Sequence, residues 1–517
     1  MRTRAFVSLL VAAVVTGLFL KHGLGFMAGF NTTPIPVLTQ LQSASAGSRA
    51  PLPPDAGRVV LVVIDGLRED EAGGLGLVVP PGMPTHRCAL ETVLPSFSRP
   101  SYVAMSTGVP PWASGVHTND HEGPAGLPTI WGAARAAGWK TRLVADGTDW
   151  WVALFPGDFD AIDLIEKAPF DAFWSGLELA APGVPGKAFE PGSLTLVHIV
   201  DVDDQGHDFG VHDAYRAAAA KAGKKVSKLI AALDPARDTL FLTADHGHIA
   251  RGGHGGPEAE VLAVPWFAFG AGVEANDARS QGWCGHLEDV PVAIAARLGI
   301  GPPAAGFGQT LAGIRPREAE AFGARLVAQT QALEVALGTT SPHAVTLGRA
   351  RAPSLLWGLA VLVAWVAAMM LVAKVLVQGS GGRAIVSAAI LPMLGIAIFL
   401  IFEPTLSFSA VWLRGPWTIR MGAIFAAVGA VATWVVLQRH APWEGLLLMA
   451  CGAGLPMLVA AAYHGSIDAG PVLGDPRAAF AIVASDMLAA ASVPVAALGA
   501  LIAAAREYRR RHQRVWT

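Results

Sequence analysis

Five long apolar runs occupy most of residues 354–505 and constrain the fold of this chain more than any other feature. Each run is close to the ~20 residues that a helix needs to cross the core of a bilayer. They are Leu355–Val377, Ala384–Phe402, Ile419–Leu437, Gly445–Tyr463 and Ala478–Ala505. The sequence therefore predicts a five-helix transmembrane domain over residues 354–517.

The first 30 residues contain one more apolar stretch. After the basic tip Met1–Arg4, an unbroken apolar run extends from Ala5 to Leu20, and a second covers Gly23–Phe30. This pattern is typical of either a cleaved signal peptide or a retained membrane anchor. Because no A-x-A cleavage site closes the run directly, the anchor is favoured, and we expect an N-terminal transmembrane anchor over residues 1–30.

Basic residues indicate how the membrane helices are oriented. They lie at the N-terminal tip, in the connections that hold Lys374, Arg383 and Arg439, and in the tail beyond residue 505. By the positive-inside rule these segments face the cytoplasm. We therefore expect an integral membrane protein with cytoplasmic N- and C-termini, and with its globular part extracytoplasmic.

The globular part shows strand-length apolar runs that alternate with helical patterns. The predicted strands are Val59–Ile64, Thr141–Ala145, Leu194–Val202, Thr239–Thr243 and Pro265–Phe269, and the predicted helices are Ile130–Ala137, Asp213–Leu233 and Leu287–Leu298. This alternation predicts an α/β fold with a mostly parallel sheet flanked by helices. We place the domain at residues 58–315, after a linker at 31–57. A connecting segment at 316–353 contains the predicted amphipathic helix Glu318–Leu337.

Charge and cysteine content exclude several function classes. The formal net charge is −2, which argues against nucleic acid as a partner. The three cysteines are Cys88, Cys284 and Cys451, and the absence of a C-x-x-C pair argues against a thiolate zinc site. If the globular part is extracytoplasmic, a disulfide between Cys88 and Cys284 is possible, and the sequence leaves this open.

Five short polar segments lie just past, or at the end of, β-rich apolar runs. They are Ile64-Asp65-Gly66, Pro95–Pro100, Asp203–His207, Asp245-His246-Gly247 and Gly253-His254-Gly255. In an open α/β sheet, ligands bind at the carboxyl ends of the strands. Aspartate and histidine are the donors that suit zinc or manganese, and paired ions of this kind promote displacement at phosphorus. The segments together predict a two-metal site for phosphoryl transfer.

Ser98 is the predicted nucleophile of this site. It stands before Arg99-Pro100 at the start of a predicted helix, where free backbone N–H groups favour a bound phosphate. Asn119 is the candidate hydrogen-bond donor to a phosphate oxygen. Arg68 could bind substrate phosphate through its guanidinium, or form a surface salt bridge instead.

Each signal has an ordinary structural explanation when it is taken alone. Asp-Gly after a strand is usually a turn, Gly-His pairs are common in loops, and Pro-x-x-Ser-Arg-Pro could be a simple helix start. Asn119 could equally be a turn residue. The order and spacing of all five segments favour the functional interpretation.

These ordered motifs resemble the alkaline phosphatase superfamily, in the branch of type I phosphodiesterases and nucleotide pyrophosphatases. Within that branch the chain is most similar to the GPI ethanolamine-phosphate transferases. The matching runs are Asp65-Gly66-Leu67-Arg68, Pro95-x-x-Ser98-Arg99-Pro100, Asp203-x-x-Gly206-His207, Asp245-His246-Gly247 and Gly253-His254-Gly255. The family plan of one N-terminal helix, an external catalytic domain and a polytopic tail is also similar.

The resemblance implies an alkaline phosphatase-like catalytic domain and a division of the metal ligands into two sets. One divalent ion would be held by Asp65, Ser98, Asp245 and His246, and the other by Asp203, His207 and His254. Zinc is the expected metal, with manganese as an alternative. Catalysis would pass through a phosphoserine at Ser98.

The implied activity is that of a membrane-bound phosphodiesterase or phosphotransferase, acting on a phosphodiester or phospholipid with membrane lipid as its partner. A phosphoethanolamine transferase is the first expectation, and a hydrolase of nucleotide or lipid diesters is the alternative. A catalytically silent membrane sensor is the alternative of another class. A sulfatase is disfavoured, because Tyr102 stands where the C/S-x-P-x-R motif requires arginine. The sequence does not indicate an oligomeric state.

Overall fold

The computed structural model describes residues 31–338, with gaps at 32, 42–51, 53–55, 148, 166–189 and 277–281, together with a few isolated residues beyond 338. The described region lies in one compact unit, Asn31–Thr346. The predicted anchor at 1–30 and the predicted transmembrane domain at 354–517 lie outside it. Among the helices that the structure describes, none has both the length and the apolar character needed to cross a membrane.

An eight-stranded sheet forms the centre of the described region. Its strand order is β4-β3-β5-β1-β6-β7-β2-β8. The strands are β1 (Arg58–Ile64), β2 (Thr85–Glu91), β3 (Lys140–Asp146), β4 (Ala161–Ile165), β5 (Ser193–Ile199), β6 (Thr239–Thr243), β7 (Ala263–Gly270) and β8 (Trp283–His286). All neighbouring pairs are parallel except those of β7, which runs antiparallel to β6 and β2. The predicted mostly parallel α/β sheet is confirmed.

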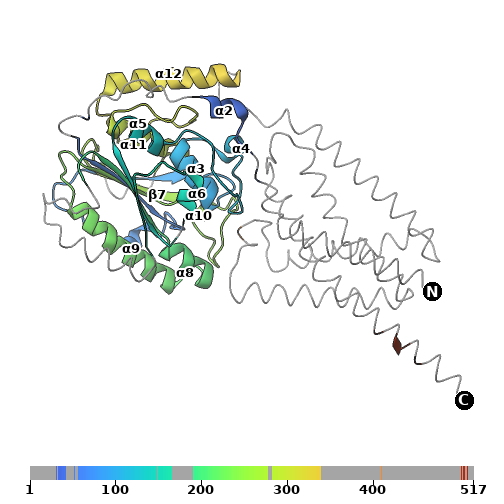
Figure 1. Ribbon diagram of the computed structural model, residues 1–517. Coiled ribbons are helices and arrows are strands. Elements are labelled where there is room, and N and C mark those ends of the chain that lie inside the picture. The colour runs from blue at the N-terminus through green and yellow to red at the C-terminus, as the bar shows by residue number, and fades with distance from the viewer. Residues whose placement is uncertain are drawn as a thin grey trace, which may run out of the picture. The chain divides into compact units, whose positions relative to one another are not determined.

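Helices cover both faces of this sheet (Figure 1). One side carries α3 (Ser98–Thr107), α5 (Ile130–Ala136) and α11 (Val290–Leu298), and the other carries α8 (Asp201–Phe209) and α9 (Asp213–Ala231). Because the central strands are covered on both sides, every residue of β5 and β6 is buried. Continuous apolar strands of this kind are what a buried parallel sheet requires.

Six short elements and one long helix complete the described region. They are α2 (Pro36–Gln40), η4 (Ala72–Leu75), α4 (Pro111–Ser114), α6 (Trp150–Leu154), α10 (Ala259–Leu262), η5 (Leu287–Asp289) and α12 (Ala319–Leu337). The segment 31–57, predicted to be a linker, contains α2, whose Leu38 is fully buried. The helix predicted at Glu318–Leu337 corresponds to α12.

A disulfide joins the last two strands at one edge of the sheet. Cys88 lies in β2 and Cys284 in β8, with their Cα atoms 5.9 Å apart, and the two sulfur atoms are bonded. The pairing that the sequence left open is therefore present in the structure. It fixes β8, the short edge strand, to its parallel neighbour.

Candidate active site

The sheet topology brings the predicted segments together at the carboxyl ends of the central strands. Strands β5, β1 and β6 are parallel neighbours, so their carboxyl ends lie side by side. Asp65 directly follows β1, α8 with Asp203 and His207 follows β5, and Asp245 and His246 follow β6. Ser98 is the first residue of α3, and His254 comes from the connection between β6 and β7.

Asp65, Asp245 and His246 form the first of two clusters, and the nucleophile candidate lies against it. The ligand atoms of these three residues lie within 4.8 Å of one another. His246 Nε2 is 3.5 Å from Asp65 Oδ1 and 3.3 Å from Asp245 Oδ2. Ser98 Oγ is 3.2 Å from the same nitrogen. All four side chains are buried.

Asp203, His207 and His254 form the second cluster. The Nε2 atoms of the two histidines are 3.0 Å apart, and Asp203 Oδ1 is 3.4 Å from His207 Nε2 and 3.7 Å from that of His254. The rings of His246 and His254 stack with centroids 3.6 Å apart. This stacking places the two clusters next to each other, in the two sets that the sequence predicts.

The imidazole tautomers are suited to metal binding. His246 Nδ1 lies 3.1 Å from the carbonyl oxygen of Gly247, and His254 Nδ1 lies 3.0 Å from that of Ser96. A carbonyl oxygen only accepts, so each Nδ1 carries the proton and each Nε2 presents its lone pair to the cluster. Backbone carbonyls commonly fix metal-binding histidines in this way.

Asp65 and Asp245, the carboxylates of the first cluster, each have one oxygen held by protein groups and one facing the clusters. Asp245 Oδ1 accepts from the backbone N–H groups of Gly66 and His246, both at 3.0 Å. Asp65 Oδ2 accepts from the hydroxyl of Tyr102 at 2.5 Å. Within the region that the structure describes, Asp245 Oδ2 and Asp65 Oδ1 are buried and have no hydrogen-bond partner. Buried oxygens of this kind are costly unless a cation or proton satisfies them, so the donor set fits divalent metal ions.

Protonation in the metal-free protein supports this interpretation. Burial lowers the pKa of His246 to about 4 and that of His254 well below its ordinary value, so both rings are neutral at pH 7. Burial, reinforced by the negative charge of Asp65, raises the pKa of Asp245 well above its usual range. The neutral imidazoles keep their lone pairs for a cation, and a metal ion bound at Asp245 would displace the proton of that carboxyl group.

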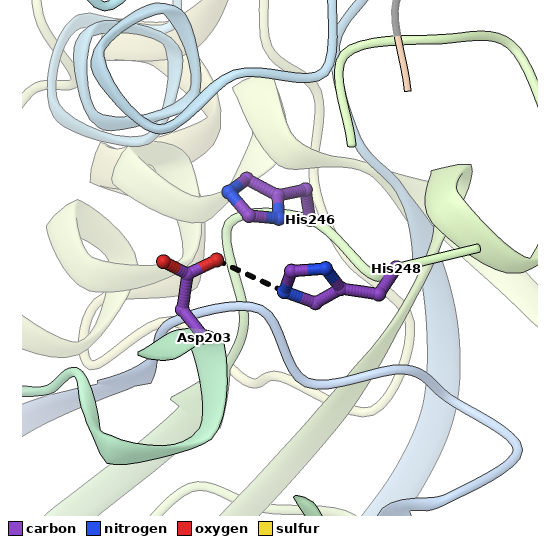
Figure 2. A group of neighbouring side chains, drawn as sticks. All are labelled: Asp203, His246 and His248. Atoms are coloured by element: carbon purple, nitrogen blue, oxygen red, sulfur yellow. Dashed lines mark hydrogen bonds and ion pairs between the residues drawn. The ribbon is translucent and has the colours of Figure 1, made fainter. Parts of the chain in front are cut away.

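Three nearby residues belong to the site although the sequence did not single them out. His248 Nε2 lies 2.9 Å from Asp203 Oδ1, as Figure 2 shows, and its ring also neighbours that of His246. His198, in β5, lies 3.0 Å from both Asp65 Oδ2 and the Tyr102 hydroxyl. Tyr102 is one turn beyond Ser98 in α3. None of the three belongs to the five predicted segments. However, His198 lies near the carboxyl end of a predicted strand, and this position could have marked it as a candidate site residue.

Asn119 and Arg68, the remaining predicted residues, have different surroundings. Asn119 Oδ1 accepts from the backbone N–H of Arg99 at 3.0 Å, which places its side chain beside the residue that follows Ser98. Its amide nitrogen is then the atom that could donate to a substrate oxygen. Arg68 instead pairs with Asp70 through two hydrogen bonds of 2.8 and 2.5 Å. The structure therefore shows the salt-bridge alternative for Arg68.

A model of the type I phosphodiesterase / nucleotide pyrophosphatase family matches residues 155–251. The matched segment contains Asp203, His207, Asp245 and His246. The match confirms the predicted resemblance to type I phosphodiesterases and nucleotide pyrophosphatases. It also confirms the prediction that the chain is a phosphoryl-transfer enzyme.

Several solved structures are similar to this chain over about half of its length. Murine ectonucleotide pyrophosphatase / phosphodiesterase 5 is 13% identical, with 47% of this chain and 95% of that chain covered and a TM-score of 0.36. A putative sulfatase from Bacteroides thetaiotaomicron is 14% identical, with 51% and 76% covered and a TM-score of 0.39. The C-terminal periplasmic domain of EcEptC from Escherichia coli, in complex with Zn, is 12% identical, with 50% and 85% covered and a TM-score of 0.34. No curated protein sequence matches significantly.

Proposed function

We propose that the chain is a membrane-bound phosphodiesterase or phosphotransferase that acts through a phosphoserine at Ser98. The observation that carries the proposal is the position of Ser98 Oγ, 3.2 Å from His246 Nε2 and beside carboxylate oxygens that lack partners in the described region. Ser98 also heads α3, and the positive end of the helix dipole at this position favours an anionic phosphate.

The candidate ligands divide into two sets. Asp65, Asp245 and His246, with Ser98, would hold one divalent ion, and Asp203, His207 and His254 would hold the other. We infer two zinc ions, because mixed imidazole and carboxylate donors suit zinc, with manganese as the alternative. When bound, the ions lower the pKa of the serine hydroxyl and stabilise negative charge on the phosphoryl oxygens.

The reaction proceeds in two displacements. Ser98 Oγ loses its proton to water and attacks phosphorus, the bond from phosphorus to the leaving-group oxygen breaks, and the leaving group departs as an alcohol after it takes a proton from water. A water molecule or an acceptor hydroxyl then attacks the phosphoserine, which breaks the bond to Oγ and regenerates the serine. Asn119 donates from its amide nitrogen to a phosphoryl oxygen as charge develops there.

We infer the location and the substrate from the sequence, with support from the disulfide. The Cys88–Cys284 bond supports an oxidising compartment, so we place the domain outside the cytoplasm, between the N-terminal anchor and the C-terminal helices. A phosphoethanolamine lipid is then an accessible donor. The family match favours a second candidate, hydrolysis of nucleotide or lipid phosphodiesters with water as the acceptor.

The test uses the full chain in detergent with bis-p-nitrophenyl phosphate. We expect hydrolysis that EDTA abolishes and that zinc or manganese restores. Ser98→Ala should lower kcat at least about 1,000-fold, because the nucleophile is removed. Ser106→Ala is the matched control, since Ser106 is a buried serine of the same helix whose Oγ accepts from Trp131 Nε1 at 3.0 Å. A Ser98→Ala enzyme with wild-type kcat would refute the mechanism.

A second experiment separates the two activities. The protein is incubated with a lipid that carries a labelled phosphoethanolamine headgroup, in membranes that contain candidate acceptors. Label found on a second molecule supports the transferase, and free labelled phosphoethanolamine supports the hydrolase. A wild-type protein that binds no divalent metal and processes neither substrate would support the catalytically silent sensor.

A further inference from the structure

His248 occupies a central position that the proposed mechanism does not use. It is fully buried, and its ring lies beside His246, His207 and His254, at centroid distances of 5.8, 5.1 and 5.4 Å. Its two nitrogens contact different parts of the site. Nε2 is 2.9 Å from Asp203 Oδ1, and Nδ1 accepts from the backbone N–H of Gly253 at 3.0 Å (Figure 2 shows the first contact).

These contacts determine the tautomer of His248. A backbone N–H can only donate, so Nδ1 is unprotonated and the ring proton is on Nε2. Nε2 then donates to Asp203 Oδ1. Both nitrogens are therefore engaged, and neither presents a lone pair to a cation. Although Asp203, His246 and His248 are close enough to form a metal triad, this arrangement makes His248 a partner of a ligand.

Neighbouring glycines, which have no side chain, leave space for the His248 ring. A Cβ added at Gly66 would lie 2.7 Å from His248 Nε2, and one added at Gly206 would lie 2.6 Å from it. Both distances are far below van der Waals contact. Gly66 follows Asp65, Gly206 precedes His207, and Gly253 precedes His254. The His248 ring thus lies against backbone that adjoins three candidate ligands, Asp65, His207 and His254. It also contacts the side chain of a fourth, Asp203.

We propose that His248 is a positioning residue for the second cluster. Its Nε2–H fixes the orientation of the Asp203 carboxylate, and its Nδ1 holds the Gly253 backbone so that His254 faces His207. Groups that orient metal ligands in this way typically contribute about 10–100-fold to metal affinity. The inference rests on the proposed two-metal function, and it assigns a role to a residue outside every recognised motif.

Two amide substitutions separate the contact with Asp203 from the contact with Gly253. In His248→Gln the amide nitrogen is as many bonds from Cβ as the imidazole Nε2, so it can still donate to Asp203. In His248→Asn the side chain is shorter, so it can accept from Gly253 but does not reach Asp203. Both variants remove any imidazole ligand, and both leave a polar group of similar size.

Zinc affinity of the full-length protein in detergent is the primary measurement, by competition with a chromophoric chelator. We expect His248→Asn to weaken zinc binding about tenfold or more, and His248→Gln to recover most of the loss. His86→Asn is a matched control, because His86 is a buried histidine whose Nδ1 bonds the Glu274 carbonyl away from the clusters. It should leave zinc affinity unchanged.

Several results would overturn the inference. Equal weakening in both amide variants would mean that His248 is a ligand or only fills space, and no weakening in either would mean that it has no role in the site. Thermal unfolding in excess chelator reports stability apart from metal. If His248→Asn does not fold, His248→Met, which fills the volume without a donor, replaces it. A wild-type protein that binds neither zinc nor manganese would instead refute the proposed function itself.

Discussion

Single side chains determine which carboxylate oxygens face the metal clusters. Asp65 illustrates this, because Oδ2 is held by the Tyr102 hydroxyl and lies 3.0 Å from His198 Nε2, while Oδ1 is the oxygen near His246. Burial and the adjacent Asp65 charge raise the pKa of Tyr102 well above its ordinary value, so the phenol stays protonated and donates. The orientation of Asp65 therefore depends on Tyr102 and His198, which are not among the candidate metal ligands.

Tyr102→Phe tests this dependence. The ring should stay in place, because it stacks on Trp151 with centroids 4.1 Å apart, and only the hydroxyl is lost. We expect zinc affinity and kcat each to fall about tenfold, since Asp65 keeps His198 but loses its shortest hydrogen bond. Chelator competition and steady-state kinetics measure the two quantities. Unchanged values for both would show that His198 alone fixes the carboxylate.

His117 gives a prediction about pH that is independent of the metal ligands. Its side chain is buried, and its Nε2 has no partner in the part of the chain that the structure describes. Burial, with a smaller contribution from His121, lowers the pKa of His117 to about 4. The unfolded chain, with an ordinary pKa near 6.5, binds a proton first as the pH falls. Stability is therefore lost between about pH 6.5 and pH 4, up to about 3 kcal/mol.

A His117→Phe variant should lose less stability over this range. The ring shape is retained, and the backbone N–H of residue 117 still bonds Asn31 Oδ1. As the pH falls from 7.5 to 5, we expect the Tm of the variant to fall less than the Tm of the wild type. If the two Tm values fall in parallel across that range, His117 has the same protonation in the folded and the unfolded protein.

At the scale of elements, the junction of β5 and α8 shows what the sequence could and could not predict. The apolar run Leu194–Val202 predicts one strand, but β5 ends at Ile199 and α8 starts at Asp201. Val202 is buried as a helix residue, so the apolar pattern continues across the boundary. Periodicity over so few residues cannot distinguish a buried strand from a buried helix turn.

The central strands were predictable, and the outer ones were not. β1 and β6 are continuous apolar runs, whereas β2 contains His86, Arg87 and Glu91, and β8 contains a glycine. Edge and mixed strands of this kind are specified by their neighbours in the sheet. The same distinction applies to the site. The candidate ligands stand in motifs, whereas the contacts of His248 with Asp203 and Gly253 depend on residues that are distant in sequence.

Gly206 in α8 gives a prediction in which local and tertiary effects oppose each other. Alanine is favoured over glycine inside a helix by about 1 kcal/mol. However, a Cβ at Gly206 would lie 2.6 Å from His248 Nε2, so the ring would have to move. We expect Gly206→Ala to weaken zinc binding about tenfold, as loss of the His248 contact does, whatever its effect on helix stability.

Gly223→Ala would be a poor control, because its Cβ would strike the Leu75 carbonyl. Gly323→Ala in α12 is suitable, since no described atom lies within 4 Å of its Cβ position. The control should raise Tm slightly and leave zinc affinity unchanged. If Gly206→Ala behaves in the same way, the packing of His248 against α8 is not needed for the second cluster.

At the scale of the whole molecule, the segment after the predicted anchor is hydrogen-bonded to the loop that holds Asn119. Asn31 immediately follows Phe30, the last residue of that predicted anchor. Its Oδ1 accepts from the backbone N–H groups of His117 and Thr118 at 2.7 and 2.9 Å, and its Nδ2 donates to Thr118 Oγ1 at 2.8 Å. The next residue, Asn119, accepts from the N–H of Arg99 beside the nucleophile. Chain connectivity therefore links residue 30 to the first turn of α3 through one short loop.

Asn31→Ala should loosen this loop without altering the metal clusters. Three hydrogen bonds are lost, each with a net contribution of about 1 kcal/mol at most sites, so the position of Asn119 relative to Ser98 becomes less defined. We expect kcat to fall about tenfold, which corresponds to about 1.4 kcal/mol of transition-state stabilisation, with zinc affinity unchanged. Thr39→Ala is the control in the same segment, since Thr39 Oγ1 bonds only the Pro36 carbonyl in the described region. A lower Tm with unchanged kcat would restrict Asn31 to a structural role, whereas loss of kcat alone would mean that the segment around Asn31 sets the geometry of phosphoryl transfer.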